Sequence, residues 1–185
     1  MIKENHKVII KKLFLNNHTE FLHSLRVASI SYKIGKAIGL TKERLEKLEL
    51  AALLHDVGKT LVPLEILNKE TKLELEEYEI IKSHTQKGYD ILNKYSTDEE
   101  FLLSVLEHHE RWDGKGYPKK KTGEEISLFA RIIAIADTYD AIISDRPYRK
   151  RRSKKEAILE IEENVGKQFD PEISRITLEK VLLVT

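Results

Sequence analysis

The spacing of apolar residues is the feature of this sequence that most limits its fold. Nearly every segment repeats them at intervals of three and four residues, as Val27, Ile30 and Ile34 do. Side chains at these intervals lie on one face of an α-helix, where a neighbouring helix can bury them. No segment alternates apolar and polar residues convincingly over the length of a strand. The sequence therefore predicts an all-α fold.

The length of the chain favours one compact domain. A chain of 185 residues can bury a sizeable core, and it contains no repeat and no linker, so residues 1–185 are predicted to form a single domain. No apolar run approaches membrane-spanning length and the opening residues are polar, so we expect a cytoplasmic protein without membrane insertion. The net charge of +1 gives no reason to expect nucleic acid as a partner.

The absence of cysteine narrows the chemistry that the chain can support. It excludes disulfide bonds, thiolate metal sites and cysteine nucleophiles. Any bound metal must therefore be held by histidine, carboxylate and water. Seven metal-competent side chains fall at or beside apolar faces of five predicted helices: His23, His55, Asp56, His84, His108, His109 and Asp137.

The run from Leu54 to Lys59 places an imidazole and a carboxylate at the end of a predicted helix. His55 continues the apolar face of that helix, so His55 and Asp56 are expected to face the interior. A buried carboxylate needs a cation or several hydrogen-bond donors to offset its desolvation. A metal ion would meet that need, and so would a simple ion pair with Lys59. Gly58 is expected to end the helix in the left-handed conformation.

Further candidate ligands lie on other apolar faces, and most have a plain structural explanation. A lone histidine such as His23 is commonly a core or surface residue. The adjacent pair His108 and His109 is harder to explain as core filler, because the two side chains differ by about 100° around the helix and suit two donors to one ion. Asp137 is a carboxylate within an apolar stripe, whereas Asp140 is expected at the surface or at a helix cap.

Convergence of the seven side chains would create a particular kind of metal site. With Asp56 bridging, they supply about eight donor bonds, which together with a shared water or hydroxide suit two five- or six-coordinate divalent ions, iron or manganese. Such a pair makes a hydroxide at neutral pH and clamps a phosphodiester for in-line attack. Lys59, Arg146 and Arg149 would neutralise the phosphate and its leaving oxygen.

The order and spacing of these residues resemble the HD-GYP family, the bacterial branch of the HD metal-dependent phosphohydrolases. The resemblance covers about residues 18–175. Its most specific part is the run from His108 to Pro118, which contains the signature residues Gly116, Tyr117 and Pro118. The matching segments are His23 to Val27, Leu54 to Lys59, His84 to Gly88, His108 to Pro118, Ala130 to Asp137, Arg146 to Arg149 and Gly166 to Pro171.

The resemblance implies an HD-type helical domain with a metal site in its core, which hydrolyses cyclic di-GMP to linear pGpG or to GMP. The implied ligands of one ion are His23, His55, Asp56 and Asp137, and those of the other are Asp56, His84, His108 and His109. Catalytic roles fall to Asp56, as the bridging carboxylate, and to Lys59, which would contact the phosphate. Arg146 and Arg149 would hold the nucleotide.

The chain departs from the family pattern in three places, the mildest of which is Leu75 where the family usually has a threonine N-cap. Members that bind three metals carry a glutamate four residues before the first histidine, where this chain has Thr19. Glu20 lies about 100° further around the helix and is expected not to replace that glutamate, so we predict a two-metal site. Few residues precede His23, so no N-terminal sensory domain is expected.

Two other functions are compatible with the sequence. The first is a regulatory module that binds a cyclic dinucleotide with little turnover and signals through a partner, such as a GGDEF cyclase docked on the loop from Trp112 to Pro118. The second keeps the chemistry but acts on another cyclic dinucleotide or on a nucleoside phosphate. The full ligand set favours catalysis, because degenerate copies of a site usually lose ligands first. A homodimer is compatible with each reading.

Overall fold

A computed structural model describes residues 18–69, 71–145 and 151–183. Within these ranges the chain forms helices and no β-strand, which confirms the predicted all-α fold. No helix there is both long and apolar enough to cross a lipid bilayer. Arg146 and Arg149, which were predicted to hold the nucleotide, lie outside the described residues.

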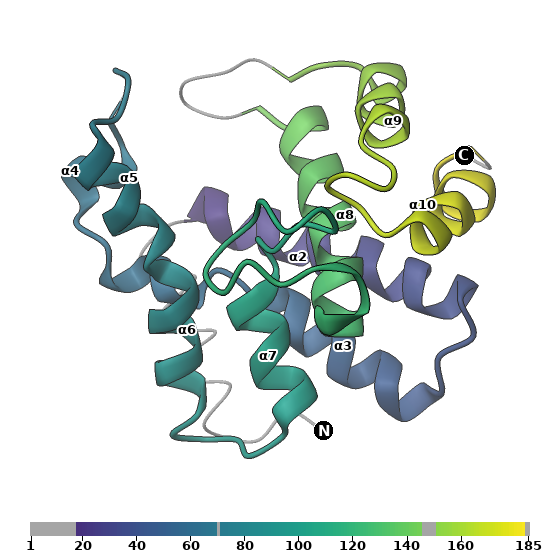
Figure 1. Cartoon of the computed structure of the whole chain (residues 1–185), viewed down its shortest axis with the longest axis horizontal. Helices are drawn as coiled ribbons and strands as arrows, with labels where there is room; N and C mark the ends of the chain where they lie inside the picture. The colour runs from purple at the N-terminus through teal and green to yellow at the C-terminus, as the bar shows by residue number, and fades with distance from the viewer. Residues whose placement is uncertain (1–17, 70, 146–150, 184–185) are drawn as a thin grey trace.

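The order of the helices along the chain can be followed in Figure 1. In chain order they are α2 (His18–Ala37), α3 (Lys42–Leu54), η1 (Val57–Leu61), α4 (Leu64–Leu67), α5 (Leu75–Lys82), α6 (His84–Leu92), α7 (Glu99–Glu107), η2 (Gly123–Glu125), α8 (Leu128–Ile143), α9 (Lys154–Glu163), α10 (Pro171–Thr177) and η3 (Leu178–Leu182).

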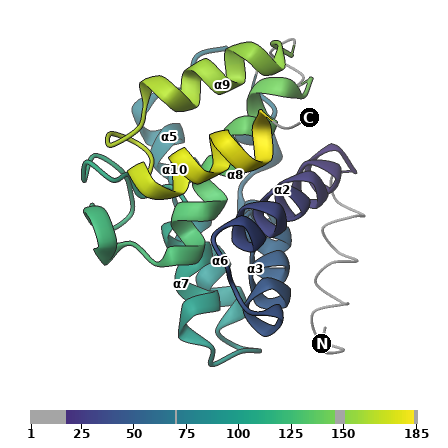
Figure 2. The same ribbon diagram turned by 90° about the vertical axis from the view of Figure 1, so that its right-hand side faces the viewer.

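Helix α8 runs through the middle of the molecule and carries much of the core (Figure 1). Its side chains Phe129, Ile132 and Ile133 are fully buried, and burial of each such side chain contributes about 1.5–3 kcal/mol. Helices α2, α7 and α9 pack against α8, and α10 packs against both α2 and α8 (Figure 2). Asp137 and Asp140 are carried on this largely apolar helix, where Asp140 is buried and Asp137 is partly buried.

The junction between η1 and α6 explains why residue 58 is glycine. A Cβ atom at Gly58 would lie 1.9 Å from the carbonyl oxygen of His84 and 2.5 Å from the backbone nitrogen of Gly88. The expected left-handed helix stop is wrong, because α3 already ends at Leu54 and Gly58 is not among the glycines with positive φ. Gly58 is instead required by the close approach of two backbones, which brings the turn after α3 against the start of α6.

Candidate metal centre

All seven side chains that were expected to bind metal meet in one place. They come from the ends or interiors of helices α2, α3, α6, α7 and α8 and the turns that follow them. Ligand atoms lie within 4.8 Å of one another in two groups, one formed by Asp56, His84, His108 and His109 and the other by His23, His55 and Asp137.

Asp56 lies between the two groups and presents a different oxygen to each. Its Oδ1 is 3.2 Å from Nε2 of His84 and 3.8 Å from Nε2 of His108. Its Oδ2 is 3.2 Å from Nε2 of His55. The carboxylate is buried, and its pKa is held well below the usual value because the positive charge of Lys59 outweighs the effect of burial. Asp56 therefore has the geometry and charge of a bridging ligand.

Backbone carbonyls orient three of the imidazoles. In each case Nδ1 lies close to the carbonyl oxygen three residues earlier, in the last turn of a helix. The pairs are His55 with Ala52, His84 with Ile81 and His108 with Val105, at 2.7, 2.7 and 2.8 Å. A carbonyl oxygen only accepts hydrogen bonds, so Nδ1 carries the proton and the lone pair of a neutral ring is on Nε2. All three lone pairs are thereby directed into the cluster.

The arrangement of these lone pairs fits a cation. Nε2 of His84 and Nε2 of His108 face each other at 3.3 Å, a contact that repels unless a positive charge is shared between the two nitrogens. Nε2 of His55 and Oδ1 of Asp56 are buried and make no hydrogen bond within the described residues. Nitrogen and carboxylate donors in this combination suit a divalent metal ion.

Burial keeps His108 and His109 in the neutral form that binds metal. It lowers the pKa of His109 to about 3. Burial and the neighbouring His109 hold the pKa of His108 well below its usual value. Both rings are therefore neutral at pH 7, as metal ligation requires. The pKa of Asp137 is lowered, because its bond to His23 outweighs the effect of burial, so this carboxylate is ionised.

His23 is held differently, by a carboxylate that the sequence analysis misplaced. Its Nδ1 lies 2.6 Å from Oδ2 of Asp140, while its Nε2 lies 3.0 Å from Oδ1 of Asp137. Burial lowers the pKa of His23, but the bonds to the two carboxylates outweigh it and raise this pKa to about 9. Asp140 is fully buried and also accepts two hydrogen bonds from Arg26, at 2.6 and 3.0 Å. The expectation that Asp140 lies at the surface or at a cap is therefore wrong.

Asp140→Asn is expected to weaken metal binding about 10- to 100-fold, as changes to carboxylates that orient ligating histidines commonly do. The amide keeps the size of the side chain but loses the charge that holds both His23 and Arg26. Metal affinity would be measured by competition with a chelating dye. Asp90→Asn is the matched control, because Asp90 is exposed on α6 and accepts a hydrogen bond from Gln86. Unchanged affinity in Asp140→Asn would show that Asp140 does not support His23.

Lys59 and Glu20 lie at the edge of the cluster. The ammonium of Lys59 is 2.6 Å from Oδ2 of Asp56 and 3.6 Å from Oε2 of Glu20, so Lys59 makes the ion pair that the sequence left open. Its contact with a phosphate stays a prediction. We expected Glu20 not to replace the glutamate of three-metal members. Its carboxylate nevertheless lies with His23 and Asp56, with ligand atoms within 4.8 Å of one another, and the number of two ions stays a prediction. Glu20 and His23 are three residues apart and share one helix face.

Comparison with known proteins places the chain in a family. Residues 7–173 match the family described as HD domain. The chain belongs to the HD domain family. This confirms the resemblance indicated by the motifs, since HD-GYP proteins are one branch of the HD phosphohydrolases.

Relatives of this HD domain include enzymes that act on cyclic dinucleotides. It is 40% identical over 153 residues to a cyclic di-GMP phosphodiesterase of Thermotoga maritima, which covers 82% of this chain and 42% of that protein. It is 34% identical over 162 residues to 3′3′-cGAMP-specific phosphodiesterase 2 of Vibrio cholerae, which covers 85% of this chain and 30% of that protein. The chain thus spans less than half the length of these relatives.

A solved structure shares the fold. The HD domain of the Listeria monocytogenes phosphodiesterase PgpH, in complex with cyclic di-AMP, aligns with a TM-score of 0.71 at 19% identity. The alignment covers 95% of this chain and 94% of that one. At this identity the likeness supports the HD fold alone.

The signature loop of this HD domain, from Trp112 to Pro118, folds back over His109. The backbone N–H of Tyr117 donates to the carbonyl oxygen of His109, and the two rings lie 4.9 Å apart at 31°. A Cβ atom at Gly116 would lie 2.4 Å from the backbone nitrogen of Arg111, so only glycine fits there. Pro118 is exposed and follows a cis peptide bond. Tyr117 therefore faces the site.

Two buried acids beneath the loop were not singled out by the sequence analysis. The carboxylate of Glu110 accepts the backbone N–H groups of Lys119 and Lys121, at 2.5 and 3.1 Å. Glu107 accepts the backbone N–H of Ser127 at 2.8 Å and also pairs with the side chain of Lys121. These carboxylates tie the loop to the end of α7 and have a structural role.

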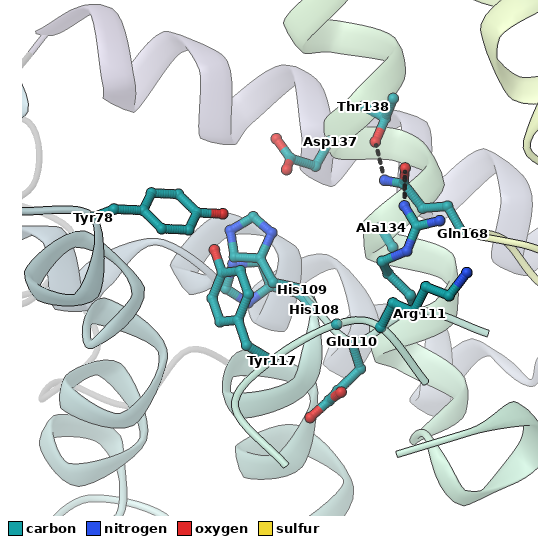
Figure 3. A pocket seen from close by; sticks show the side chains of 12 residues that line it. Tyr78, His108, His109, Glu110, Arg111, Tyr117, Ala134, Asp137, Thr138 and Gln168 are labelled. Carbon is teal, nitrogen blue, oxygen red and sulfur yellow. Dashed lines mark hydrogen bonds between the residues drawn. The ribbon is translucent and has the colours of Figure 1, made fainter. Parts of the chain in front are cut away.

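A hollow of about 190 Å³ opens beside His109 and Asp137 (Figure 3). Tyr78 and Tyr117 stand at one side of it, and the polar side chains Arg111, Thr138 and Gln168 stand at the other. Pockets that enclose drug-sized ligands usually measure about 300–1,000 Å³. A ligand as large as a dinucleotide would therefore place its phosphate at the cluster and extend beyond the hollow.

Proposed function

We propose that this HD domain is a metal-dependent phosphodiesterase that hydrolyses a cyclic dinucleotide, with cyclic di-GMP as its substrate. The observation that carries the proposal is Asp56, whose two oxygens face two groups of metal-competent side chains in one buried cluster. The substrate class is supported by relatives at 34–40% identity, which are phosphodiesterases of cyclic di-GMP or of 3′3′-cGAMP.

The proposed site holds two divalent ions, iron or manganese. One would be bound by His23, His55, Asp56 and Asp137, and the other by Asp56, His84, His108 and His109. When bound, such a pair supplies a nucleophile at neutral pH and neutralises the charge that develops on the phosphodiester. Carboxylates and imidazoles without thiolates suit both metals.

The protein itself orients the side chains of the site and limits the access of water. Backbone carbonyls in the last turns of α3, α5 and α7 hold three imidazoles in place before any ligand arrives, so little reorganisation is needed during the reaction. Tyr117 covers one face of His109 and limits access of water from that side. Lys59 is proposed to shift from Asp56 to the phosphate, since the ions would then balance the charge of Asp56. Arg146 and Arg149 are proposed to hold the nucleotide.

The deciding experiment is hydrolysis by protein loaded anaerobically with iron(II) or with manganese(II). Chromatography of the products is expected to show loss of cyclic di-GMP and appearance of pGpG, of GMP or of both. Absence of cleavage with either metal under reducing conditions would overturn the proposal. Tight binding of the nucleotide without cleavage would favour the regulatory module instead.

Metal analysis of the same preparation tests the number of ions. About two per chain are expected, as in other two-metal hydrolytic sites. Because Glu20 lies beside His23 and Asp56, a value near three would assign a further ion to that carboxylate. A substrate series with cyclic di-GMP, 3′3′-cGAMP and cyclic di-AMP would establish which nucleotide is preferred.

A further inference from the structure

The polar wall of the hollow includes Gln168, which comes from the family-like segment Gly166–Pro171. Two backbone hydrogen bonds hold this segment against the signature loop. The N–H of Trp112 donates to the carbonyl of Gln168 at 3.1 Å, and the N–H of Asp113 donates to the carbonyl of Lys167 at 2.8 Å. Gln168 therefore has a fixed backbone position beside Arg111 and Thr138, on the side of the hollow away from Tyr78 (Figure 3).

Arg111 determines which way the amide of Gln168 faces. Its Nη1 donates to Oε1 of Gln168 at 3.0 Å, while its Nε and Nη2 donate to the carboxylate of Asp113 at 3.1 and 3.0 Å. A guanidinium offers donors only, so the atom that faces Arg111 must be the amide oxygen. The amide nitrogen of Gln168 is thereby turned toward Thr138 and the hollow.

The amide nitrogen still has hydrogen-bonding capacity. Of its two protons, one points to Oγ1 of Thr138 at 3.4 Å, the long end of hydrogen-bond distance. The part of the chain that the structure describes offers no acceptor for the other. Since Arg111 engages the oxygen, Gln168 presents an N–H donor to a ligand in the hollow.

This restriction matters for the recognition of a nucleobase. An unrestrained glutamine can accept from N6 and donate to N7 of adenine, which is the usual glutamine–adenine pairing. Guanine presents two acceptors, O6 and N7, along the same edge. N7 is an acceptor in both bases, so only the other position separates them. A glutamine that can only donate bonds to O6 of guanine, whereas adenine has the N6 amino group, itself a donor, at that position.

We propose that Gln168 is a specificity-determining residue that donates a hydrogen bond to the acceptor edge of a guanine base, with Arg111 as its positioning residue. The inference rests on the proposed function, because it takes a cyclic dinucleotide as the ligand. It assigns the preference to ligands that contain at least one guanine. It agrees with the names of the two relatives, since cyclic di-GMP and cGAMP both contain that base.

Gln168→Met tests the donor directly, because it keeps the length of the side chain and removes its hydrogen bonds. We expect KM for cyclic di-GMP to rise about tenfold, the usual effect of losing one such bond, with kcat little changed. KM for cyclic di-AMP should change less than about twofold, since adenine has an amino donor instead of O6 and so loses no bond to Gln168. Dissociation constants of non-hydrolysable phosphorothioate analogues should move in the same way. Gln86→Met is the matched control, because Gln86 is exposed on α6 and bonds to Asp90.

Arg111→Met tests the positioning role. Without the guanidinium, the amide of Gln168 can rotate and accept from adenine. The ratio of the affinities for cyclic di-GMP and cyclic di-AMP should therefore move closer to one. If Arg111 only stabilised the loop, its substitution would lower the affinity for both ligands by the same factor. In the double variant Arg111→Met with Gln168→Met, the ratio should equal that of Gln168→Met alone if Arg111 acts through the amide.

The results separate this inference from the proposed function. If wild-type protein cleaves none of the cyclic dinucleotides, the function fails, while the binding constants of the analogues still report on Gln168. If wild-type protein cleaves them, the comparison is between KM values. A Gln168→Met substitution that changes KM equally for cyclic di-GMP, 3′3′-cGAMP and cyclic di-AMP, or changes none of them, overturns the assignment of Gln168 to guanine.

Discussion

Asp56→Asn is expected to reduce turnover of cyclic di-GMP by about three orders of magnitude, because one substitution disturbs both proposed ion sites. The amide is nearly the same size as the carboxylate, yet it carries no charge and one of its two oxygens becomes a donor-only nitrogen. Either Oδ1, which faces His84, or Oδ2, which faces His55, is lost as a ligand. Initial rates with iron(II) and manganese(II), together with bound metal by mass spectrometry, measure the effect.

Asp90→Asn provides the matched comparison for this substitution. It makes the same chemical change on an exposed side chain of α6 and should retain wild-type rates and metal content. Circular dichroism of both variants establishes that the helices persist. Full metal content and full activity in Asp56→Asn would remove the central reason for treating Asp56 as a bridge.

Gly58→Ala is expected to destabilise the protein by about 3 kcal/mol or more, since overpacking between rigid elements has costs of this size. The added methyl group would occupy the space of the His84 carbonyl oxygen, 1.9 Å away, and backbone cannot rotate aside as a side chain can. For a domain of this length the melting temperature should fall by about 6–12 °C. Thermal and urea unfolding of metal-free protein would measure the change without a contribution from bound ions.

Gly39→Ala separates the two reasons for which a chain needs glycine. Gly39 has a φ of +86° and no atom near its missing Cβ, so the substitution strains the backbone without a clash. It should cost only about 1–2 kcal/mol. An equal or smaller loss in Gly58→Ala would mean that η1 and α6 can separate easily, contrary to the packing described.

Helical periodicity was sufficient to predict the all-α fold and to place His55, His108 and Asp137 on buried faces. That information is local, because it depends on residues within a few turns of one another. Their meeting in one cluster was inferred from the combined pattern and from the family resemblance. The structure brings them together because the apolar faces that carry them pack around α8.

The errors concern relationships between distant segments. Asp140 reaches His23 across 117 positions, and its spacing of three residues from Asp137 was the available signal that both share a face. Gly58 was interpreted through its own helix, although its neighbour is the backbone of α6. The carboxylate of Glu20 lies near His23 and Asp56, a proximity that comparison with Thr19 alone did not indicate. Packing partners of this kind carry no local signature.

The anchoring of imidazoles to the last turns of helices has a consequence for exchange of the bound ions. His55 and His108 cannot swing away while their Nδ1–H groups remain bonded to Ala52 and Val105. Departure of an ion by that route requires the terminal turn of α3 or α7 to fray. The lifetime of the holo state is then governed by local opening of helix ends, and sequence changes that stiffen those turns would slow metal loss without altering any ligand.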